Sequence, residues 1–149
     1  MTDDNVIARG YVTNGFDAAM QFRFVSATKD EIVVEFDIDA QHRQPYGIVH
    51  GGVYCAVFES VCSTGAALNA MPRGQSVVGL ENHTTFVRAA RSGHVRVTAR
   101  PVTRGRRTQV WEAEARGDDE KLLATGRVRL LCLEREAEIA GETVKTPGA

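Results

Sequence analysis

One segment of helical periodicity stands among runs of β-favouring residues, and this arrangement limits the chain to few folds. From Gly52 onward, apolar residues recur three or four positions apart, and the pattern ends before the turn Met71-Pro72-Arg73-Gly74. The recurring residues are Val53, Ala56, Val57, Val61 and Leu68. The spacing predicts one long helix.

The segments on either side of this helix have the composition of β-strands. The predicted strands are 21–27, 31–38, 76–87, 94–102, 108–115 and 122–133. The first two flank the polar turn Thr28-Lys29-Asp30, which indicates a hairpin, and glycines separate the later ones. Elements in this order predict an α+β domain, in which an antiparallel sheet wraps around one long central helix. We expect this single domain over 1–134 and a polar, frayed C-terminal tail over 135–149.

Length and composition exclude several classes of protein. A chain of 149 residues fits one domain, and no apolar run approaches the roughly 18 residues needed to cross a bilayer. The N-terminus has no signal-peptide pattern, so we expect a cytoplasmic protein without a membrane partner. Three cysteines, without metal-ligand spacing, predict small buried residues and no metal site. A net charge of -1 gives no general attraction to nucleic acid.

Glu59 is the one residue with a formal charge between Arg43 and Arg73, and it lies in the middle of the predicted helix. At about 100° per residue it shares a face with small residues, including Cys55 and Ser63, where an ordinary solvent-facing surface would carry several charges. A carboxylate in such a place has a partner or a function. Two readings stay open: a buried acid paired with an arginine, or a catalytic group.

The start of the helix offers a possible anion site. His50-Gly51-Gly52 leaves backbone N–H groups unobstructed at the positive end of the helix dipole, where an anion or a developing oxyanion is stabilised. A second reading of these glycines is that they serve only to let the chain enter the helix and bind no anion. Gly51 and Glu59 are eight residues apart, about 12 Å along the helix, so one carbonyl group does not reach both. If both serve one reaction, two antiparallel copies of the helix must form a shared site in a dimer.

At these residues the chain resembles the hotdog-fold thioesterases, in the branch with a catalytic glutamate. That branch includes 4-hydroxybenzoyl-CoA thioesterase, 1,4-dihydroxy-2-naphthoyl-CoA hydrolase and the enterobactin proofreading thioesterase. The matching stretches are His50-Gly51-Gly52, Glu59-Ser60 with Ser63, Val77-Val78-Gly79-Leu80-Glu81, Val87-Arg88, and Gly105-x-Arg107-x-Gln109-Val110-Trp111. They extend over roughly 44–133, and their order makes the resemblance specific.

The resemblance implies a role for each matched catalytic position. It implies that Glu59 is the nucleophile or the general base and that the Gly51 amide is the oxyanion donor. Gln44 and His50 match polar residues that surround the thioester from the subunit opposite Glu59. Ser63, one turn after Glu59, matches the hydroxyl residue that steadies the attacking group, although packing alone would also explain a serine there. A histidine that only satisfies loop backbone groups is the second reading of His50.

The resemblance also implies a function for the arginine-rich segment. Seven arginines and no acid occur from Arg88 to Arg107, and guanidinium groups bind the phosphates of coenzyme A well. The implied substrate-binding residues are Gly79, Phe86, Val87, Arg88, Ala89, Thr103, Arg104, Gly105, Arg106, Arg107 and Thr108. A solvated strand face is the other reading, which we expect for Arg96 and Arg100. Nucleic acid is disfavoured, because few aromatic residues lie near these arginines.

The expected activity is therefore hydrolysis of an acyl-CoA thioester without metal or organic cofactor, by a homodimer that shares its active sites and pairs into a homotetramer. Thr85 and Phe86 depart from the Asn and His that related enzymes have there. A phenyl ring makes the pocket less polar, which favours an unsubstituted aryl or medium-chain acyl group. The alternatives are a 3-hydroxyacyl thioester dehydratase or hydratase, whose catalytic histidine has no match on the helix, and a non-enzymatic acyl-CoA-binding protein.

Overall fold

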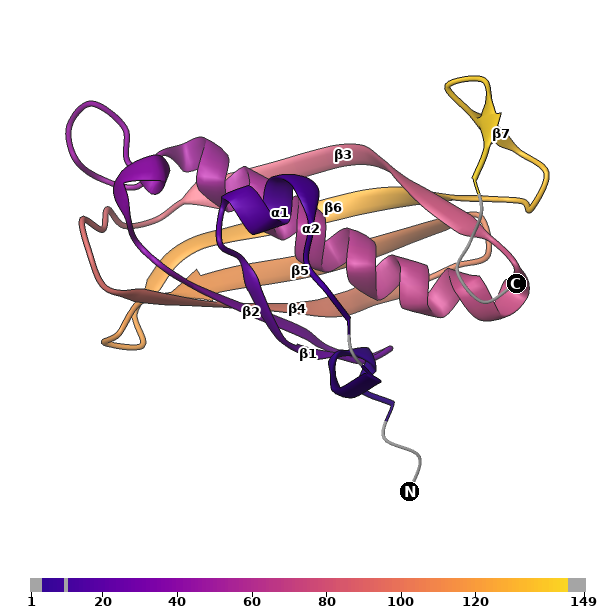
Figure 1. Cartoon of the computed structure of the whole chain (residues 1–149), viewed down its shortest axis with the longest axis horizontal. Helices are drawn as coiled ribbons and strands as arrows, with labels where there is room; N and C mark the ends of the chain where they lie inside the picture. The colour runs from indigo at the N-terminus through magenta and orange to yellow at the C-terminus, as the bar shows by residue number, and fades with distance from the viewer. Residues whose placement is uncertain (1–3, 10, 145–149) are drawn as a thin grey trace.

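A curved antiparallel sheet holds one long helix against its concave face (Figure 1). The computed structural model describes residues 4–9 and 11–144. The strand order of the main sheet is β1-β2-β4-β5-β6-β3. The strands are β1 (Arg23–Ala27), β2 (Ile32–Asp37), β3 (Ser76–Phe86), β4 (His94–Arg104), β5 (Thr108–Arg116) and β6 (Leu122–Leu133). The long helix is α2 (Gly51–Ala70), and the short helices are η1 (Val6–Arg9), α1 (Gly15–Ala19), η2 (Ala40–His42) and η3 (Met71–Arg73). The predicted α+β hotdog fold is confirmed.

Helix α2 begins and ends where local chemistry requires it. The His50 ring nitrogen Nδ1 accepts a hydrogen bond from the Gly52 N–H at 2.8 Å, which caps the first turn. At the other end Pro72 lies within η3, and Gly74 has a φ of 71°, a left-handed conformation that glycine adopts without strain. The helix is therefore confined to the segment that the periodicity predicted, with Gly51 as one additional residue.

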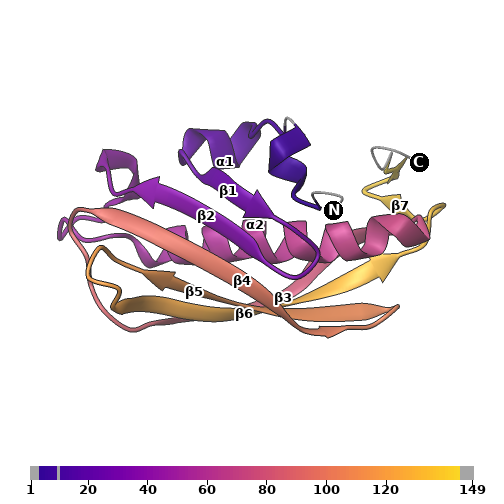
Figure 2. The same ribbon diagram turned by 90° about the horizontal axis from the view of Figure 1, so that it is seen from below.

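The core lies between α2 and the concave face of the sheet. In Figure 2 strands β4, β5 and β6 lie on one side of α2 and α1 on the other. The fully buried side chains include Val57, Phe58 and Val61 from the helix and Trp111 from β5. A Cβ atom on Gly65 would lie 2.5 Å from the Trp111 ring, so only a glycine lets the helix approach the sheet this closely.

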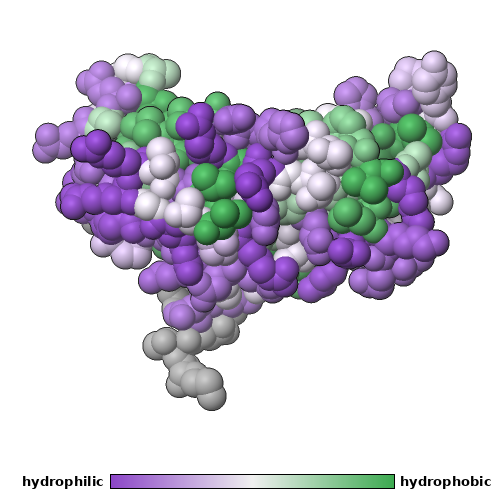
Figure 3. Space-filling view, turned by 180° about the vertical axis from the view of Figure 1, so that it is seen from behind, coloured by the Kyte–Doolittle hydropathy of each residue, from purple (hydrophilic) through white to green (hydrophobic). Residues whose placement is uncertain are grey.

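The convex face of the sheet is polar, as strand alternation requires. Figure 3 views this side and shows hydrophilic side chains over much of it, with hydrophobic patches between them. Ion pairs cross neighbouring strands: Arg127 meets Glu112 at 3.2 Å, and Arg129 meets Glu81 at 3.4 Å. Arg96 and Arg100 are exposed and pair with glutamates of β2 and of the β1–β2 turn. These pairs account for the strand-face arginines without any ligand.

The structure adds elements that the sequence patterns did not reveal. Helix α1 is short and without buried residues, so it carries no apolar periodicity, and Asp17 from it accepts a hydrogen bond from Ser60 of α2 at 2.6 Å. Strand β4 continues to Arg104, because a register shift between Pro101 and Thr103 accommodates the proline.

No helix among the described residues is long and apolar enough to span a membrane.

The tail that we expected to fray has local structure in its described part. Strands β7 (Glu138–Ile139) and β8 (Glu142–Thr143) pair as a hairpin. Ala140 and Gly141 between them have φ values of 53° and 82°, the left-handed conformations that suit a two-residue hairpin loop. The remainder of the predicted tail, 145–149, lies outside the described residues, as do 1–3 and 10 of the predicted domain.

Candidate active site

Glu59 lies half-buried on α2, facing the edge strand β3. Its Oε2 accepts a hydrogen bond from the Asn82 side-chain amide at 3.0 Å, and its Oε1 accepts one from the Ser63 hydroxyl at 3.4 Å. A Cβ atom on Gly79 would collide with Oε1, so the carboxylate lies directly against the backbone of β3. Among the described residues no arginine or lysine pairs with Glu59, and both carboxylate oxygens accept hydrogen bonds from neutral side chains.

Asn82 is a site residue that the sequence analysis missed. Its amide nitrogen donates both to Glu59 and to the Cys55 carbonyl at 2.9 Å, and its Oδ1 accepts from the Thr84 hydroxyl at 2.7 Å. The Thr84 bond fixes which end of the amide faces Glu59. The only signal in the sequence was the polar run Asn82-His83-Thr84-Thr85 inside a predicted strand, which breaks the usual alternation.

The start of α2 presents an unpaired donor. The Gly51 N–H has no acceptor among the described residues, whereas the Gly52 N–H is bound by His50. Because Nδ1 of His50 accepts that bond, a neutral His50 carries its proton on Nε2, and the exposed side chain presents a second donor. The geometry suits an oxygen atom that gains negative charge.

A cleft of about 280 Å³ adjoins this helix start and brings together several of the predicted site residues. Its lining comprises Gln44, Ile48, Val49, Gly51, Tyr54, Phe86, Val87, Arg88, Ala89 and Ala90. A Cβ atom on Gly51 would lie 2.6 Å from the Phe86 ring, so this ring packs over the helix start. Gln44 accepts from the Tyr46 N–H through its carbonyl oxygen, and its NH₂ group has no acceptor among the described residues. The predictions did not include Tyr54 or the apolar lining residues Ile48, Val49 and Ala90.

The remaining predicted residues lie elsewhere in the chain. Glu59 and Ser63 are two and three turns along α2 from Gly51, and neither lines the cleft. The turn 103–108 joins β4 to β5 near the C-terminal end of α2, where Arg104 contacts Asn69. Within a single chain, Gly51, Glu59 and the turn 103–108 therefore lie at three different positions along α2 and do not meet in one site.

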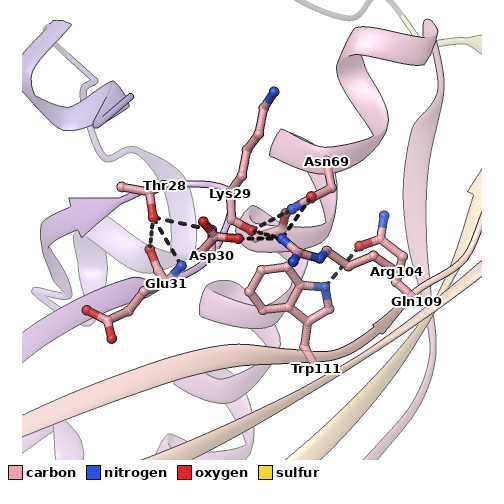
Figure 4. A network of polar contacts seen from close by, with 9 residues as sticks. Thr28, Lys29, Asp30, Glu31, Asn69, Arg104, Gln109 and Trp111 are labelled. Atoms are coloured by element: carbon pink, nitrogen blue, oxygen red, sulfur yellow. Dashed lines mark hydrogen bonds and ion pairs between the residues drawn. The ribbon is translucent and has the colours of Figure 1, made fainter. Parts of the chain in front are cut away.

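The arginines of the predicted nucleotide site differ in their availability. Arg104 is held by the Asp30 carboxylate at 2.6 Å, the Lys29 carbonyl at 3.1 Å and the Asn69 side chain at 3.5 Å (Figure 4). Arg88 pairs with Asp119 at 2.7 Å, and this guanidinium lowers the pKa of the Asp119 carboxyl below its ordinary value. Both arginines are thus occupied by acids of the same chain.

Arg106 and Arg107 are exposed and make no side-chain ion pair among the described residues. Two further arginines, which the predictions omitted, lie beside them. Arg73 donates to Gln75 at 2.9 Å, and Gln75 donates to the Arg106 carbonyl at 3.1 Å. The Arg135 guanidinium is 3.3 Å from the position of a Cβ atom on Gly74. This group of four, here called the arginine cluster, offers guanidinium groups for phosphate oxygens.

No group of three or more His, Cys, Asp and Glu in the described parts of the chain is placed to hold a metal ion.

The fold is that of the hotdog thioesterases, and the chain belongs to the thioesterase superfamily. The model of that family matches residues 46–124. The expectation of an enzyme of this family is therefore confirmed.

Known proteins that resemble the chain agree with this family. The structure of Rv1847/MT1895 from Mycobacterium tuberculosis superposes with a TM-score of 0.78 at 41% identity, over 80% of this chain and 96% of that one. Thioesterase HI1161 from Haemophilus influenzae gives a TM-score of 0.77 at 30% identity, over 82% and 85%. The 1,4-dihydroxy-2-naphthoyl-CoA hydrolase of Escherichia coli is 33% identical over 109 residues, which are 73% of this chain and 79% of that enzyme.

Proposed function

We propose that the chain hydrolyses an acyl-CoA thioester, with an aryl or medium-chain acyl group, to the free acid and CoA. The observation that carries the proposal is the environment of Glu59. It is a half-buried carboxylate that pairs with no cation in the described part of the chain, held by Asn82 and Ser63 against the edge of the sheet. An acid kept in this way is available for chemistry. The similarity to 1,4-dihydroxy-2-naphthoyl-CoA hydrolases supports CoA as the carrier.

In the proposed reaction, Glu59 either attacks the thioester carbonyl carbon or takes a proton from a water molecule that attacks it. Either route places negative charge on the carbonyl oxygen, which the Gly51 N–H stabilises. The C–S bond then breaks, and the sulfur leaves as thiolate and takes up a proton. In the first route, water then hydrolyses the anhydride formed on Glu59. His50 and Gln44 supply further donors around the carbonyl group.

We further propose that the working unit is a homodimer joined through β3, and that two such dimers form the homotetramer. Strand β3 ends the sheet and pairs only with β6 within the described chain, so its other edge is open. Leu80 and Phe86 on this strand are 48% and 56% exposed. A two-fold axis beside the strand would place α2 antiparallel to its copy, so that Glu59 of one subunit approaches Gly51 of the other.

For the nucleotide of CoA we propose Arg106 and Arg107 with the rest of the arginine cluster. The turn lies beside Asn69, ten residues or about 15 Å along α2 from Glu59. This separation leaves room for the extended arm of CoA between its thioester and its phosphates. Arg104 would contribute by anchoring the turn to Asp30.

The test is a hydrolysis screen across aryl and aliphatic CoA thioesters with the wild-type protein and Glu59→Gln. We expect turnover of at least one class, and a loss of at least about 10²-fold in kcat in the variant with unchanged melting temperature. Glu112→Gln, on the convex face of the sheet, is the matched control and should retain activity. Near-wild-type turnover by Glu59→Gln would refute the assignment.

A further inference from the structure

The side chain of Gln75 is buried, 1% exposed, between the end of α2 and the start of β3, and its amide bonds to three separate segments. Its Oε1 accepts a hydrogen bond from Arg73 Nε at 2.9 Å. Its Nε2 donates to the Arg106 carbonyl at 3.1 Å and to Glu134 Oε1 at 3.0 Å. Both N–H groups of the amide are thus in use. A buried amide with every donor paired holds its partners in one arrangement.

The three segments that Gln75 joins carry the arginine cluster. Arg73 is the last residue of η3, Arg106 and Arg107 lie in the turn between β4 and β5, and Arg135 lies just beyond the end of β6. The bonds from the Gln75 amide nitrogen span 31 and 59 positions of the chain. In the described chain, Gln75 is the one side chain that hydrogen-bonds to all three segments. It therefore links the pieces from which the cluster is built.

The bond to the Arg106 carbonyl also sets the direction of the turn. The Arg107 carbonyl accepts from the Cys132 N–H at 2.8 Å, so two successive carbonyls of the turn face buried residues. The described peptide bonds are all trans, and in a trans peptide the C=O and the following N–H point in opposite directions. The Arg107 N–H therefore points away from Gln75, and it has no acceptor among the described residues. A backbone donor beside exposed guanidinium groups suits a phosphate oxygen.

Gln75 also leaves the cluster its positive charge. Glu134 directly precedes Arg135 and is the acid nearest to it in sequence, but its Oε1 accepts from the neutral Gln75 amide. It makes no ion pair within the described residues. Arg73 likewise bonds to an uncharged oxygen of Gln75, so its charge is not cancelled. The cluster thus stays cationic, as an anionic ligand requires.

We propose that Gln75 is the positioning residue of the nucleotide site, which holds the β4–β5 turn and the arginine cluster in the arrangement that binds the phosphates of CoA. The inference rests on the proposed function, which assigns the cluster to CoA. Because Gln75 is buried, it does not touch CoA and acts through Arg106, Arg73 and Glu134. Its loss should weaken nucleotide binding and leave the chemistry at Glu59 as it is.

Gln75→Met tests this, because it keeps the size of the side chain and removes the amide. We expect the Kd for free CoA, measured by calorimetry, and the KM for a CoA thioester to rise about tenfold, with kcat nearly unchanged. KM for an N-acetylcysteamine thioester, which has no nucleotide, should not change. Gln21→Met is the matched control and should leave both constants unchanged, since Gln21 is exposed beside β1, at the opposite edge of the sheet from β3.

A second variant and a double-mutant cycle separate positioning from general destabilisation. Gln75→Glu cannot donate as a carboxylate and adds a negative charge beside the cluster, so it should weaken CoA binding at least as much. In the Arg106→Ala/Arg107→Ala background, Gln75→Met should weaken CoA binding by about threefold or less, because part of what it positions is gone. Melting temperatures establish that each variant is folded at the temperature of the assay.

The outcomes distinguish this inference from the function on which it rests. A full tenfold loss in both backgrounds would show a merely structural role and overturn the inference. So would CoA binding that is weakened by the arginine substitutions but not by Gln75→Met or Gln75→Glu, and in that case the proposed function would stand. A wild type that does not bind CoA would overturn both.

Discussion

The Asn82 side-chain amide lies 3.0 Å from Glu59 Oε2 and 2.9 Å from the Cys55 carbonyl, so it ties the carboxylate to its own helix. Thr84 holds the other end of this amide at 2.7 Å. Asn82 is therefore a positioning residue, because it orients Glu59 through Oε2 and leaves Oε1 to Ser63. A carboxylate held in one orientation attacks, or accepts a proton, with less loss of conformational freedom.

Two substitutions of Asn82 should have different effects. Asn82→Ala releases Glu59, and we expect kcat to fall about tenfold with little change in KM. Asn82→Asp places a second carboxylate beside the first, which raises the pKa of the pair, so the acid limb of the pH–rate profile should move to higher pH. Rate measurements between about pH 5 and pH 9 on both variants test this. Unchanged profiles would show that the Asn82 contact has no influence on the reaction.

Gly79→Ala should move the carboxylate without disturbing the fold. The new Cβ atom would collide with Glu59 Oε1, the far end of a flexible side chain, while Gly79 itself is exposed. We expect kcat to fall by roughly 10- to 100-fold, as for a misplaced catalytic group, and the melting temperature to change little. Gly117→Ala is the matched control, since its Cβ atom would meet nothing closer than 3.5 Å. Equal activity in the two variants would contradict this geometry.

Substitutions of the arginines in the turn 103–108 should have two different kinds of effect, one on substrate binding and one on stability. Arg106→Ala with Arg107→Ala should raise KM for CoA esters about tenfold and leave kcat nearly unchanged, because these side chains would bind only the nucleotide. KM for an N-acetylcysteamine thioester, which lacks the nucleotide, should not change. Arg104→Ala should instead lower the melting temperature, since it breaks the contacts with Asp30 and Asn69. An equal rise of KM for both thioesters would rule out the phosphate site.

Mixed dimers test the proposed sharing of the active site between two subunits. Glu59→Ala and Gln44→Ala homodimers should each be impaired, but a heterodimer of the two combines both lesions in one site and leaves the other site intact. After dissociation and reassembly, activity should return to about half the wild-type rate per heterodimer if the sites act independently. Mixing without subunit exchange should recover nothing. Verified heterodimers that stay inactive would show that the site lies within one chain, or that Gln44 plays no part.

His94 should give the stability a measurable pH dependence. A hydrogen bond to Asp37 at 2.9 Å, aided by Glu35, raises the pKa of His94 above its ordinary value of 6.5. The folded state therefore holds this proton more tightly, so the contribution to the free energy of unfolding is complete below the ordinary pKa. It is lost as the pH rises through the folded-state pKa. The same bond lowers the pKa of Asp37, whose contribution is lost only in acid.

Urea unfolding of the wild type and His94→Gln measures this effect. The stability difference between the two proteins should be larger at about pH 5.5 than at about pH 8.5, and small at both because the groups are on the surface. A difference that is the same at both pH values would mean that His94 stabilises through packing and not through its charge.

The sequence alone determined the elements that depend on neighbouring residues. The apolar spacing after Gly52 specified α2, and alternation with β-favouring residues specified the six strands of the main sheet, because helical and strand periodicity are local properties. Glu59 was identified by the same local reasoning, as a charge where the helix pattern called for none. Helix α1 was not predicted, because it has no buried residues and hence no apolar pattern.

The tertiary structure alone decided which distant groups meet. Asn82 reaches Glu59 through the placement of β3 beside α2, with a register shift between Gly79 and Glu81. Arg104 pairs with Asp30, which is 74 residues away, whereas its neighbours Arg106 and Arg107 pair with no acid in the described ranges. Tyr54 looks like one more core aromatic in the sequence, and only the structure shows that its buried hydroxyl has no hydrogen-bond partner among the described residues. These outcomes depend on strand register and on the close packing of helix against sheet, which join residues far apart in the chain and leave no local periodicity to read.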